Sequence, residues 1–333
     1  MTGPLSVLDQ SPISEGSTGG EALARSVDLA RHAEALGYTR YWVAEHHGTA
    51  MLACTSPEIL IAEIAAATTR IRVGSGGVML PHYSPLKVAE VFSMLSGLHP
   101  GRIDLGLGRA AGTDPVTAFA LQRDRGHAIV DDFPQQLNEL LAFLYDAVPP
   151  QHSFAKLGKV LPGLPERPEP WLLGSSPQSG IWAAEAGLPY AFADFISPTG
   201  AALTKRYRDD FKPSVIRSEP YVITAVAAIC AETDDAAQRL ASSARMAFTL
   251  FLQGMPIQVP PVDVALRFLA ERPGALEAVS AHRRFIVGSP ATVLRGIAAV
   301  QQEYAADEMM IVTIIHDHAA RRRSYELIAE AYR

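Results

Sequence analysis

The sequence alternates short β-prone runs with longer helical stretches, and this alternation constrains the fold more than any other feature. Eight runs rich in β-branched and other apolar residues recur along the chain, each followed by a helical pattern. Because 333 residues suit one large α/β domain, this spacing predicts a closed (β/α)8 barrel, the TIM barrel, as a single domain over residues 1–333. The expected strands are 5–8, 41–44, 71–75, 103–107, 171–174, 190–193, 221–228 and 309–314.

Local signals mark several helix ends. Serine precedes proline at three expected helix starts, so we expect a hydroxyl at the N-cap and proline in the first turn. These serines are Ser56, Ser84 and Ser289. Gly37 follows the helical pattern over 21–36 and is expected to end that helix.

Two proline-rich stretches interrupt the alternation. Residues 149–170 lie after the fourth helix and before the fifth strand, and residues 254–282 lie before the eighth strand. Because the barrel pattern resumes after each stretch, we interpret both as insertions and not as linkers. A loop as long as the second one is typical of an active-site lid.

Composition argues against several classes of protein. Charged residues make up 19% of the chain and apolar residues 48%, which is typical of a well-packed globule and not of a disordered chain. The net charge of −6, with no basic block longer than 321–323, argues against a nucleic-acid partner. Cys54 and Cys230 lack metal-type spacing, and no leader-like or membrane-spanning pattern is seen. We therefore expect a cytoplasmic protein with reduced thiols and no membrane partner.

The carboxyl ends of the strands carry the chemistry in barrels of this kind. The second strand runs into Glu45, His46 and His47, and imidazoles beside a carboxylate suit general acid–base catalysis near neutral pH. The structural alternative is that one imidazole packs in the barrel and the other caps a loop. Three polar residues together at the reactive end favour a functional role.

Glycines stand at the ends of the third and fourth strands. Gly76 and Gly77 leave bare backbone that a flat ligand can approach, although a structural need explains them equally well. On the fourth strand, alternation turns Gly106 and Gly108 into the barrel, and Arg109 at the rim presents a fork suited to a phosphate. The G-x-G-x-x-A spacing that begins there also matches a dinucleotide fold. That alternative is weaker because the spacing follows the fourth strand and opens no clear helix.

The fifth strand ends in Ser175 and Ser176 at an expected helix start, where hydroxyls and backbone N–H groups form an anion site. Helix capping is the structural alternative for either serine, and it does not exclude anion binding. Near the C-terminus, His316, Asp317 and His318 are metal-capable residue types with no further ligand nearby. We interpret them as a loop feature or as polar groups at the mouth of the barrel, and expect no metal.

Several longer motifs resemble the bacterial luciferase-like flavin monooxygenases, nearest to the single-chain bacterial oxidoreductases of that family. The resemblance runs essentially from one end of the chain to the other, and together the motifs are specific. They are the segments 43–47 (VAEHH), 74–81 (GSGGVMLP), 100–109 (PGRIDLGLGR), 182–189 (WAAEAGLP) and 287–290 (VGSP).

The resemblance implies a TIM barrel that binds reduced FMN at the carboxyl ends of its strands. It implies a non-prolyl cis peptide at Gly76–Gly77 that supports the isoalloxazine, and phosphate contacts from Arg109 and the two serines after the fifth strand. A further phosphate arginine is expected in the following loop, where we favour Arg125 over Arg123. The implied cofactor contacts are Gly76, Gly77, Gly108, Arg109, Arg125, Leu173, Ser175 and Ser176.

The family's catalytic histidine corresponds to His46, which the resemblance implies as a base that manages proton transfer around the flavin hydroperoxide. Two positions depart from luciferase. The reactive cysteine beside its flavin is replaced by Gly108, and its phosphate-binding glutamate is replaced by Ser175. Flavin binding is still expected, whereas light emission from long aldehydes is not.

We therefore predict a monooxygenase that uses FMNH2 and O2 and acts through a flavin C4a-hydroperoxide on a small hydrophobic organic substrate. Hydroxylation, epoxidation and Baeyer–Villiger oxidation are the expected outcomes, and the excess of Arg over Lys is consistent with natural-product tailoring in a bacterium. The expected partners are a separate NAD(P)H-dependent flavin reductase and a second copy of the chain, paired through helices 58–68 and 86–98. The alternatives are a non-catalytic flavin-binding relative and an F420-dependent oxidoreductase on the same barrel.

Overall fold

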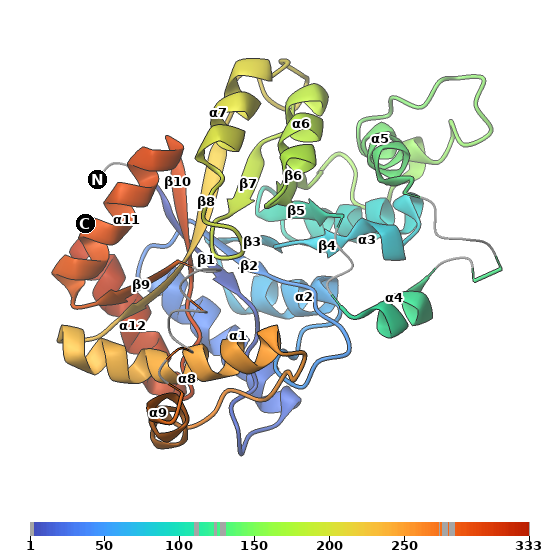
Figure 1. Cartoon of the computed structure of the whole chain (residues 1–333). Coiled ribbons are helices and arrows are strands. Elements are labelled where there is room, and N and C mark those ends of the chain that lie inside the picture. The colour runs from blue at the N-terminus through green and yellow to red at the C-terminus, as the bar shows by residue number, and fades with distance from the viewer. Residues whose placement is uncertain are drawn as a thin grey trace.

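A closed barrel of parallel strands lies at the centre of the computed structural model, which describes residues 3–109, 113–122, 125–126, 131–272, 274, 279 and 284–332. In order around the barrel, the strands are β1 (Leu5–Asp9), β2 (Arg40–Val43), β3 (Arg72–Ser75), β5 (Ile103–Gly108), β6 (Glu169–Gly174), β7 (Tyr190–Ala193), β8 (Val222–Cys230) and β10 (Glu308–Val312). The sheet closes because β10 pairs with both β1 and β8. Helices surround the strands (Figure 1), so the predicted (β/α)8 fold is confirmed.

All eight predicted strands are present, and two further strands go beyond the prediction. β4 (Val78–Met79) has only two residues and pairs with β5, so it leaves no periodic pattern to detect. β9 (Phe285–Gly288) pairs with the second half of β8, whereas the first half of β8 pairs with β10. β9 therefore inserts beside β8 at the carboxyl end of the barrel, just after the second expected insertion.

Helices follow the strands as expected. They are α1 (Gly19–Ala35), α2 (Pro57–Ala67), α3 (Pro85–Leu98), α4 (Pro115–Leu121), α5 (Phe133–Leu144), α6 (Pro177–Ala186), α7 (Ala201–Asp210), α8 (Asp234–Leu252), α9 (Val262–Ala270), α11 (Pro290–Tyr304) and α12 (His318–Tyr332), with short 3₁₀ turns η1 (Leu80–His82) and η2 (Gly158–Val160). In Figure 1, α4 and α5 lie on one side of the barrel, and α8, α9, α11 and α12 lie on the opposite side.

The three Ser-Pro pairs lie at helix starts, with serine at the N-cap and proline in the first turn as predicted. Ser56, Ser84 and Ser289 occupy the N-cap positions of α2, α3 and α11, and none of their side chains accepts a capping hydrogen bond. Proline in the first turn has its φ preset near the helical value, which favours a helix start at these positions. Side chains do cap other helices, among them Thr18 at α1 and Asp114 at α4, where Pro115 follows the capping residue. Gly37 has φ +80° directly after α1, as predicted for a helix end.

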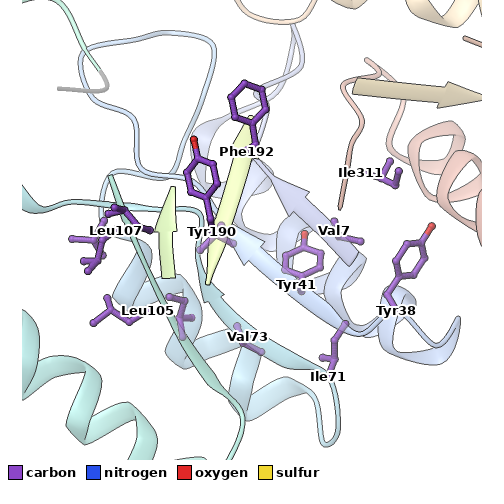
Figure 2. Packing of buried hydrophobic residues seen from close by; sticks show 14 of the residues in the cluster. Val7, Tyr38, Tyr41, Ile71, Val73, Leu105, Leu107, Tyr190, Phe192 and Ile311 are labelled. Carbon is purple, nitrogen blue, oxygen red and sulfur yellow. The ribbon is translucent and has the colours of Figure 1, made fainter. Parts of the chain in front are cut away.

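Side chains alternate between the two faces of the barrel strands. On β5, Ile103, Leu105 and Leu107 belong to the large outer cluster between strands and helices, part of which Figure 2 shows. The inner face carries a separate cluster that includes Trp42 and Trp171, whose rings meet edge to face with centroids 5.3 Å apart. The predicted outward orientation of the three β5 residues is confirmed.

The amino-terminal end of the barrel is closed by buried ion pairs. Arg40, the first residue of β2, lies 2.9 Å from Asp104 and 3.1 Å from Glu308, and both carboxylates are fully buried. Arg72, the first residue of β3, also pairs with Asp104 and lies 3.1 Å from Glu169. This cluster, here called the basal ion cluster, leaves the other end of the barrel for a ligand.

The first expected insertion packs against the barrel. Gly163 donates its N–H to Ser93 Oγ on α3 at 2.9 Å, and a Cβ at Gly163 would lie 1.6 Å from the Ser93 carbonyl oxygen. The second expected insertion, residues 254–282, lies partly outside the described residues. Its described part reaches the segment that follows β1, because Val259 donates its N–H to the Ile13 carbonyl oxygen at 2.8 Å.

Both cysteines are free thiols in the protein interior. Burial raises the pKa of Cys54 and of Cys230 to about 12, so both are thiols and not thiolates near neutral pH. The described helices include none that combines the length and the apolar character needed to cross a bilayer.

Candidate functional site

A cavity of about 270 Å³ lies at the carboxyl ends of the strands. Segments that are distant in sequence meet in its wall, from the β3–β4 loop through β5 and β6 to β7 and β8. Seven residues predicted to contact a cofactor line it: Gly76, Gly77, Gly108, Arg109, Leu173, Ser175 and Ser176. The structure therefore brings most of the predicted site into one place.

The glycines in this wall serve two different purposes. A Cβ at Gly76 would lie 2.4 Å from a leucine methyl carbon of β1, and one at Gly77 would lie 2.8 Å from the Gly106 carbonyl oxygen. Close packing therefore requires glycine at both positions, and the peptide between them is cis, as the resemblance implies. At Gly108 the nearest atom to a Cβ is the sulfur of the flexible Met79 side chain, at 3.3 Å. Gly108 therefore differs from the other two glycines, because it lines the cavity and its nearest neighbour is a flexible side chain.

One end of the cavity is suited to an anion. Arg109 directly follows β5, and Ser175 and Ser176 directly precede α6. Neither serine hydroxyl has a hydrogen-bond partner among the described residues, and the helix N-terminus adds positive potential. Arg109 lies 3.2 Å from Asp131, and these two side chains are 47% and 62% exposed, so the pair is weak and can exchange for another anion.

Small side chains open the other side of the cavity. Ala191 and Ala193 on β7 and Ala225 on β8 line it, and Ala193 is the register partner of Ala225. Phe195 and Ile196 continue this wall towards the rim. These residues were not predicted to belong to the site, although the alternation of large and small residues in β7 is a signal that could have revealed them. The result is an apolar wall facing the glycines.

A buried carboxylate lies behind the cavity wall. Glu45 is fully buried, and its Oε2 accepts the N–H of Met79 at 3.0 Å. Its Oε1 accepts the Tyr83 hydroxyl at 2.9 Å and lies 2.7 Å from His47 Nε2. Burial raises the pKa of Tyr83, and the neighbouring carboxylate raises it further. Because Met79 lines the cavity, Glu45 fixes part of the wall and also orients His47.

Two predicted site residues lie outside the cavity wall as the structure describes it. His46 donates its backbone N–H to the Cys54 carbonyl at 2.9 Å, and its side chain is half-buried. Arg125 is exposed and donates to the Ala120 carbonyl. The other candidate arginine, Arg123, lies outside the described residues. The roles of His46 and Arg125 stay predictions.

The histidines near the C-terminus have separate partners. His316 Nε2 lies 3.2 Å from the Glu15 carbonyl oxygen, and His318 Nε2 lies 2.8 Å from Asp28. Over the described ranges, no three His, Cys, Asp or Glu side chains are grouped so that they could hold a metal ion. These histidines therefore link the last β–α connection to the β1–α1 region.

The cavity wall also includes Trp182, which the sequence analysis contains only as part of a motif. Its ring stacks on Phe133, and the Arg109 guanidinium lies over it. No local pattern signals this arrangement, because the three residues come from α6, α5 and the end of β5.

Comparisons with known proteins give close relatives over the full barrel. A family model described as luciferase-like monooxygenase matches residues 4–307. A luciferase-like monooxygenase of Escherichia coli K12 is 42% identical over 97% of this chain and 95% of its own length. N-acetyl-S-alkylcysteine monooxygenase of Bacillus subtilis is 36% identical over 98% of this chain and 97% of its own. The crystal structure of apo-MsnO8 is 42% identical with a TM-score of 0.92, covering 99% of this chain and 98% of its own.

Two more distant structures share the fold alone. The oxygenating constituent of 3,6-diketocamphane monooxygenase of Pseudomonas putida, in complex with FMN, is 19% identical with a TM-score of 0.71, over 99% of this chain and 97% of its own. An F420-dependent secondary alcohol dehydrogenase with an F420–acetone adduct is 13% identical with a TM-score of 0.69, over all of both chains. Both neighbours use a cofactor of the flavin type.

Proposed function

The chain belongs to the luciferase-like monooxygenase family, and we propose that it is an FMN-dependent monooxygenase. In this proposal it binds FMNH2, uses O2 and inserts one oxygen atom into a small hydrophobic organic substrate by the C4a-hydroperoxide route, through hydroxylation, epoxidation or Baeyer–Villiger oxidation. The observation that carries the proposal is the cavity itself, in which a cationic, hydroxyl-lined end meets a bare glycine wall and an apolar wall.

The residues of the cavity fit FMN. A phosphate would be held by the Arg109 guanidinium, by the hydroxyls of Ser175 and Ser176 and by the N-terminus of α6. The flat ring would lie against the Gly76–Gly77 backbone and the space at Gly108. When bound and reduced, the flavin supplies the electrons that activate O2. Arg125 is proposed as a second phosphate contact on the resemblance alone.

Two imidazoles lie in the segment that follows β2. His46 is the base that the resemblance implies, and we retain it as the proposed catalytic residue. His47 Nε2 lies 2.7 Å from the buried Glu45, so Nδ1 is the ring nitrogen without this carboxylate contact. The role of Glu45 is to fix the orientation of that ring.

The substrate side of the cavity favours an uncharged, apolar group. Ala191, Ala193 and Ala225 contribute only methyl groups to the wall, so a hydrophobic substrate replaces water there without losing hydrogen bonds. Since one relative is named N-acetyl-S-alkylcysteine monooxygenase, S-alkylated N-acetylcysteines are the first substrates to try. Tailoring of a bacterial natural product is the wider expectation.

We further propose that residues 1–333 act as one domain in the cytoplasm and receive FMNH2 from a separate NAD(P)H-dependent reductase. A homodimer is proposed through α2 and α3, which expose Ile59 (70%), Met94 (55%) and Leu98 (66%). Light scattering on the wild type and on I59K/L98K tests this surface. A dimeric mass that falls to the monomer mass in the variant supports it, and a monomeric wild type contradicts it.

The oxygen chemistry is tested by mixing photoreduced FMN, in the presence of excess protein, with oxygenated buffer. We expect reoxidation to be slower than for free FMN, and we expect H46A to remove most of that effect. With N-acetyl-S-methylcysteine and a flavin reductase, ¹⁸O2 should label the product with one atom. Reoxidation at the free rate contradicts the proposal.

Two other outcomes indicate the alternative functions. FMN binding with reoxidation that is slowed equally in the wild type and H46A, and with no labelled product, indicates a non-catalytic flavin-binding relative. Binding of F420 but not FMN indicates the F420-dependent oxidoreductase.

A further inference from the structure

Trp182 connects the arginine at the anion end of the cavity to the packed shell of the barrel. The Arg109 guanidinium carbon lies 5.6 Å from the centroid of the Trp182 ring, within the range of a cation–π interaction. The Phe133 ring is stacked on Trp182, with centroids 5.1 Å apart and 29° between the planes. Three residues from three different elements therefore form one stack at the wall of the cavity.

The stack is buried at the Phe133 end and exposed to solvent at the Arg109 end. Phe133 is 1% exposed and begins the buried face of α5, and Trp182 is half-buried on α6 beside the fully packed Ala183. The Arg109 side chain is 47% exposed, and its ion pair with Asp131 is exposed as well. The aromatic ring is thus the better-anchored of the two contacts that Arg109 makes within the described part of the chain.

We propose that Trp182 is a positioning residue for phosphate recognition, which holds Arg109 beside Ser175 and Ser176 so that the cavity selects FMN over riboflavin. This inference rests on the proposed function and deepens it. It states why the chain takes the phosphorylated flavin, and it assigns that selectivity to a residue that does not itself touch the phosphate.

The chemistry of the guanidinium supports these separate roles, in which Arg109 binds the phosphate and Trp182 holds Arg109 in place. A cation–π contact is made with the π-system of the ring and not with a hydrogen-bond acceptor, so it does not place a second acceptor beside the guanidinium N–H donors. Asp131, in contrast, accepts one of those donors and competes with a phosphate for it. Trp182 therefore restricts the motion of Arg109 without competing for the ligand, and less side-chain freedom is lost on binding.

The test compares FMN with riboflavin, since the two differ only in the phosphate. Each flavin is titrated, oxidised and photoreduced under anaerobic conditions, into the wild type, W182L, W182F and R109Q, with binding followed by calorimetry. We expect the wild type to prefer FMN, and W182L to lose about three- to fivefold in FMN affinity with riboflavin affinity changed less than about twofold. W182F, which keeps a ring, should lose less than W182L.

A double-variant cycle and a control separate positioning from packing. In the R109Q background, W182L should cause no further loss of selectivity between the two flavins. I196A is the control, because Ile196 lines the same cavity and should shift both affinities by the same factor. If W182L fails to fold, W182F and W182M carry the same comparison.

Three results overturn the inference. If W182L weakens FMN and riboflavin equally, Trp182 is only a wall of the cavity. If the wild type binds both flavins equally, the anion end does not select a phosphate, although flavin binding stands. If the wild type binds neither flavin, the proposed function itself fails, and this inference fails with it.

Discussion

At the amino-terminal end of the barrel five of the eight strands carry a charged residue at their first or second position, whereas at the carboxyl end several strands run into glycine, alanine or serine. The basal ion cluster takes Arg40, Arg72, Asp104, Glu169 and Glu308 from the first or second positions of their strands. Trp42 also contacts this cluster, because its indole N–H donates to the Asp104 carboxylate at 2.8 Å. At the other end, the same strands and loops enclose a cavity of about 270 Å³.

The difference between the ends separates stability from ligand binding. Buried charges are expensive to leave unpaired, so the basal ion cluster permits one arrangement of the strand starts. Small residues at the carboxyl end leave space, and space at the core costs stability unless a ligand or loop fills it. A variant at the basal end should therefore change the free energy of unfolding, and a variant at the open end should change ligand affinity.

Loss of Arg40 is expected to have the largest effect. R40M leaves Asp104 and Glu308 buried without their shared cation, so we expect the free energy of unfolding to fall by about 3–5 kcal/mol. Urea denaturation measures this change. The control is R206M, which removes an exposed pair with Asp210 on α7 and should cost less than about 1 kcal/mol. Equal effects in the two variants would contradict the special role of the basal cluster.

Glu45 is one of the fully buried carboxylates at the open end, and Met79 and Tyr83 donate hydrogen bonds to it. E45Q keeps the volume but weakens the bonds to Met79, Tyr83 and His47, so we expect a loss of about 1.5–3 kcal/mol in the free energy of unfolding. The FMN affinity should fall as well, because the Met79 wall is released. Y83F, which removes one donor only, should lose less in both measurements. If E45Q keeps wild-type stability and FMN affinity, Glu45 does not support the site as we propose.

A large side chain at Gly108 should lower ligand affinity with little change in stability, in contrast to a variant of the basal ion cluster. We expect G108L to lower FMN affinity at least about tenfold while the free energy of unfolding changes by less than about 1 kcal/mol. G108A is the matched control, because the nearest atoms to its Cβ belong to the flexible Met79 side chain, and it should leave affinity within about threefold. If G108L binds FMN normally, the ring does not lie where we propose.

The smallest expected effect is a pH effect near the start of β3. Glu34 accepts the N–H groups of Thr69, Arg70 and Ile71, and these bonds lower its pKa from the ordinary value of 4.5 to about 2, even though burial opposes the shift. A lowered pKa in the folded state means that this contribution to stability is complete above pH 4.5 and is lost as the pH falls towards 2.

The corresponding variant is E34Q. Because Glu34 is only partly buried, solvent weakens its hydrogen bonds, and we expect the free energy of unfolding of the wild type to exceed that of E34Q by about 1 kcal/mol at pH 6, with a smaller difference at pH 2.5. Denaturation at the two pH values measures it. A difference that grows as the pH falls would reverse the sign and contradict the assignment.

Much of the site could be predicted because the carboxyl ends of parallel barrel strands meet at one edge. Gly76, Gly108, Arg109 and Ser175 each follow a recognisable strand, so knowing the fold class was enough to expect them together. The alternation of β5 likewise indicated which of its residues face the helices. These are local patterns, read within a few residues of the chain.

The remaining features depend on contacts between distant segments. Arg40 pairs with Glu308, Glu45 accepts a hydrogen bond from Met79, and Trp182 lies between Arg109 and Phe133. No local sequence pattern around these residues indicates these contacts. The structure also separates the glycines, which look alike in sequence. Packing requires Gly76 and Gly77, whereas Gly108 leaves room for a ligand.

The sequence by itself therefore determined the order of strands and helices, the barrel they form and the residues that end each strand. These follow from periodicity, turn chemistry and chain connectivity, which act over short distances. Only the tertiary structure decided which charges neutralise one another, which ring supports Arg109 and which glycines open a cavity. Those outcomes depend on side-chain packing across the barrel, where the partners are neighbours in space but not in the chain.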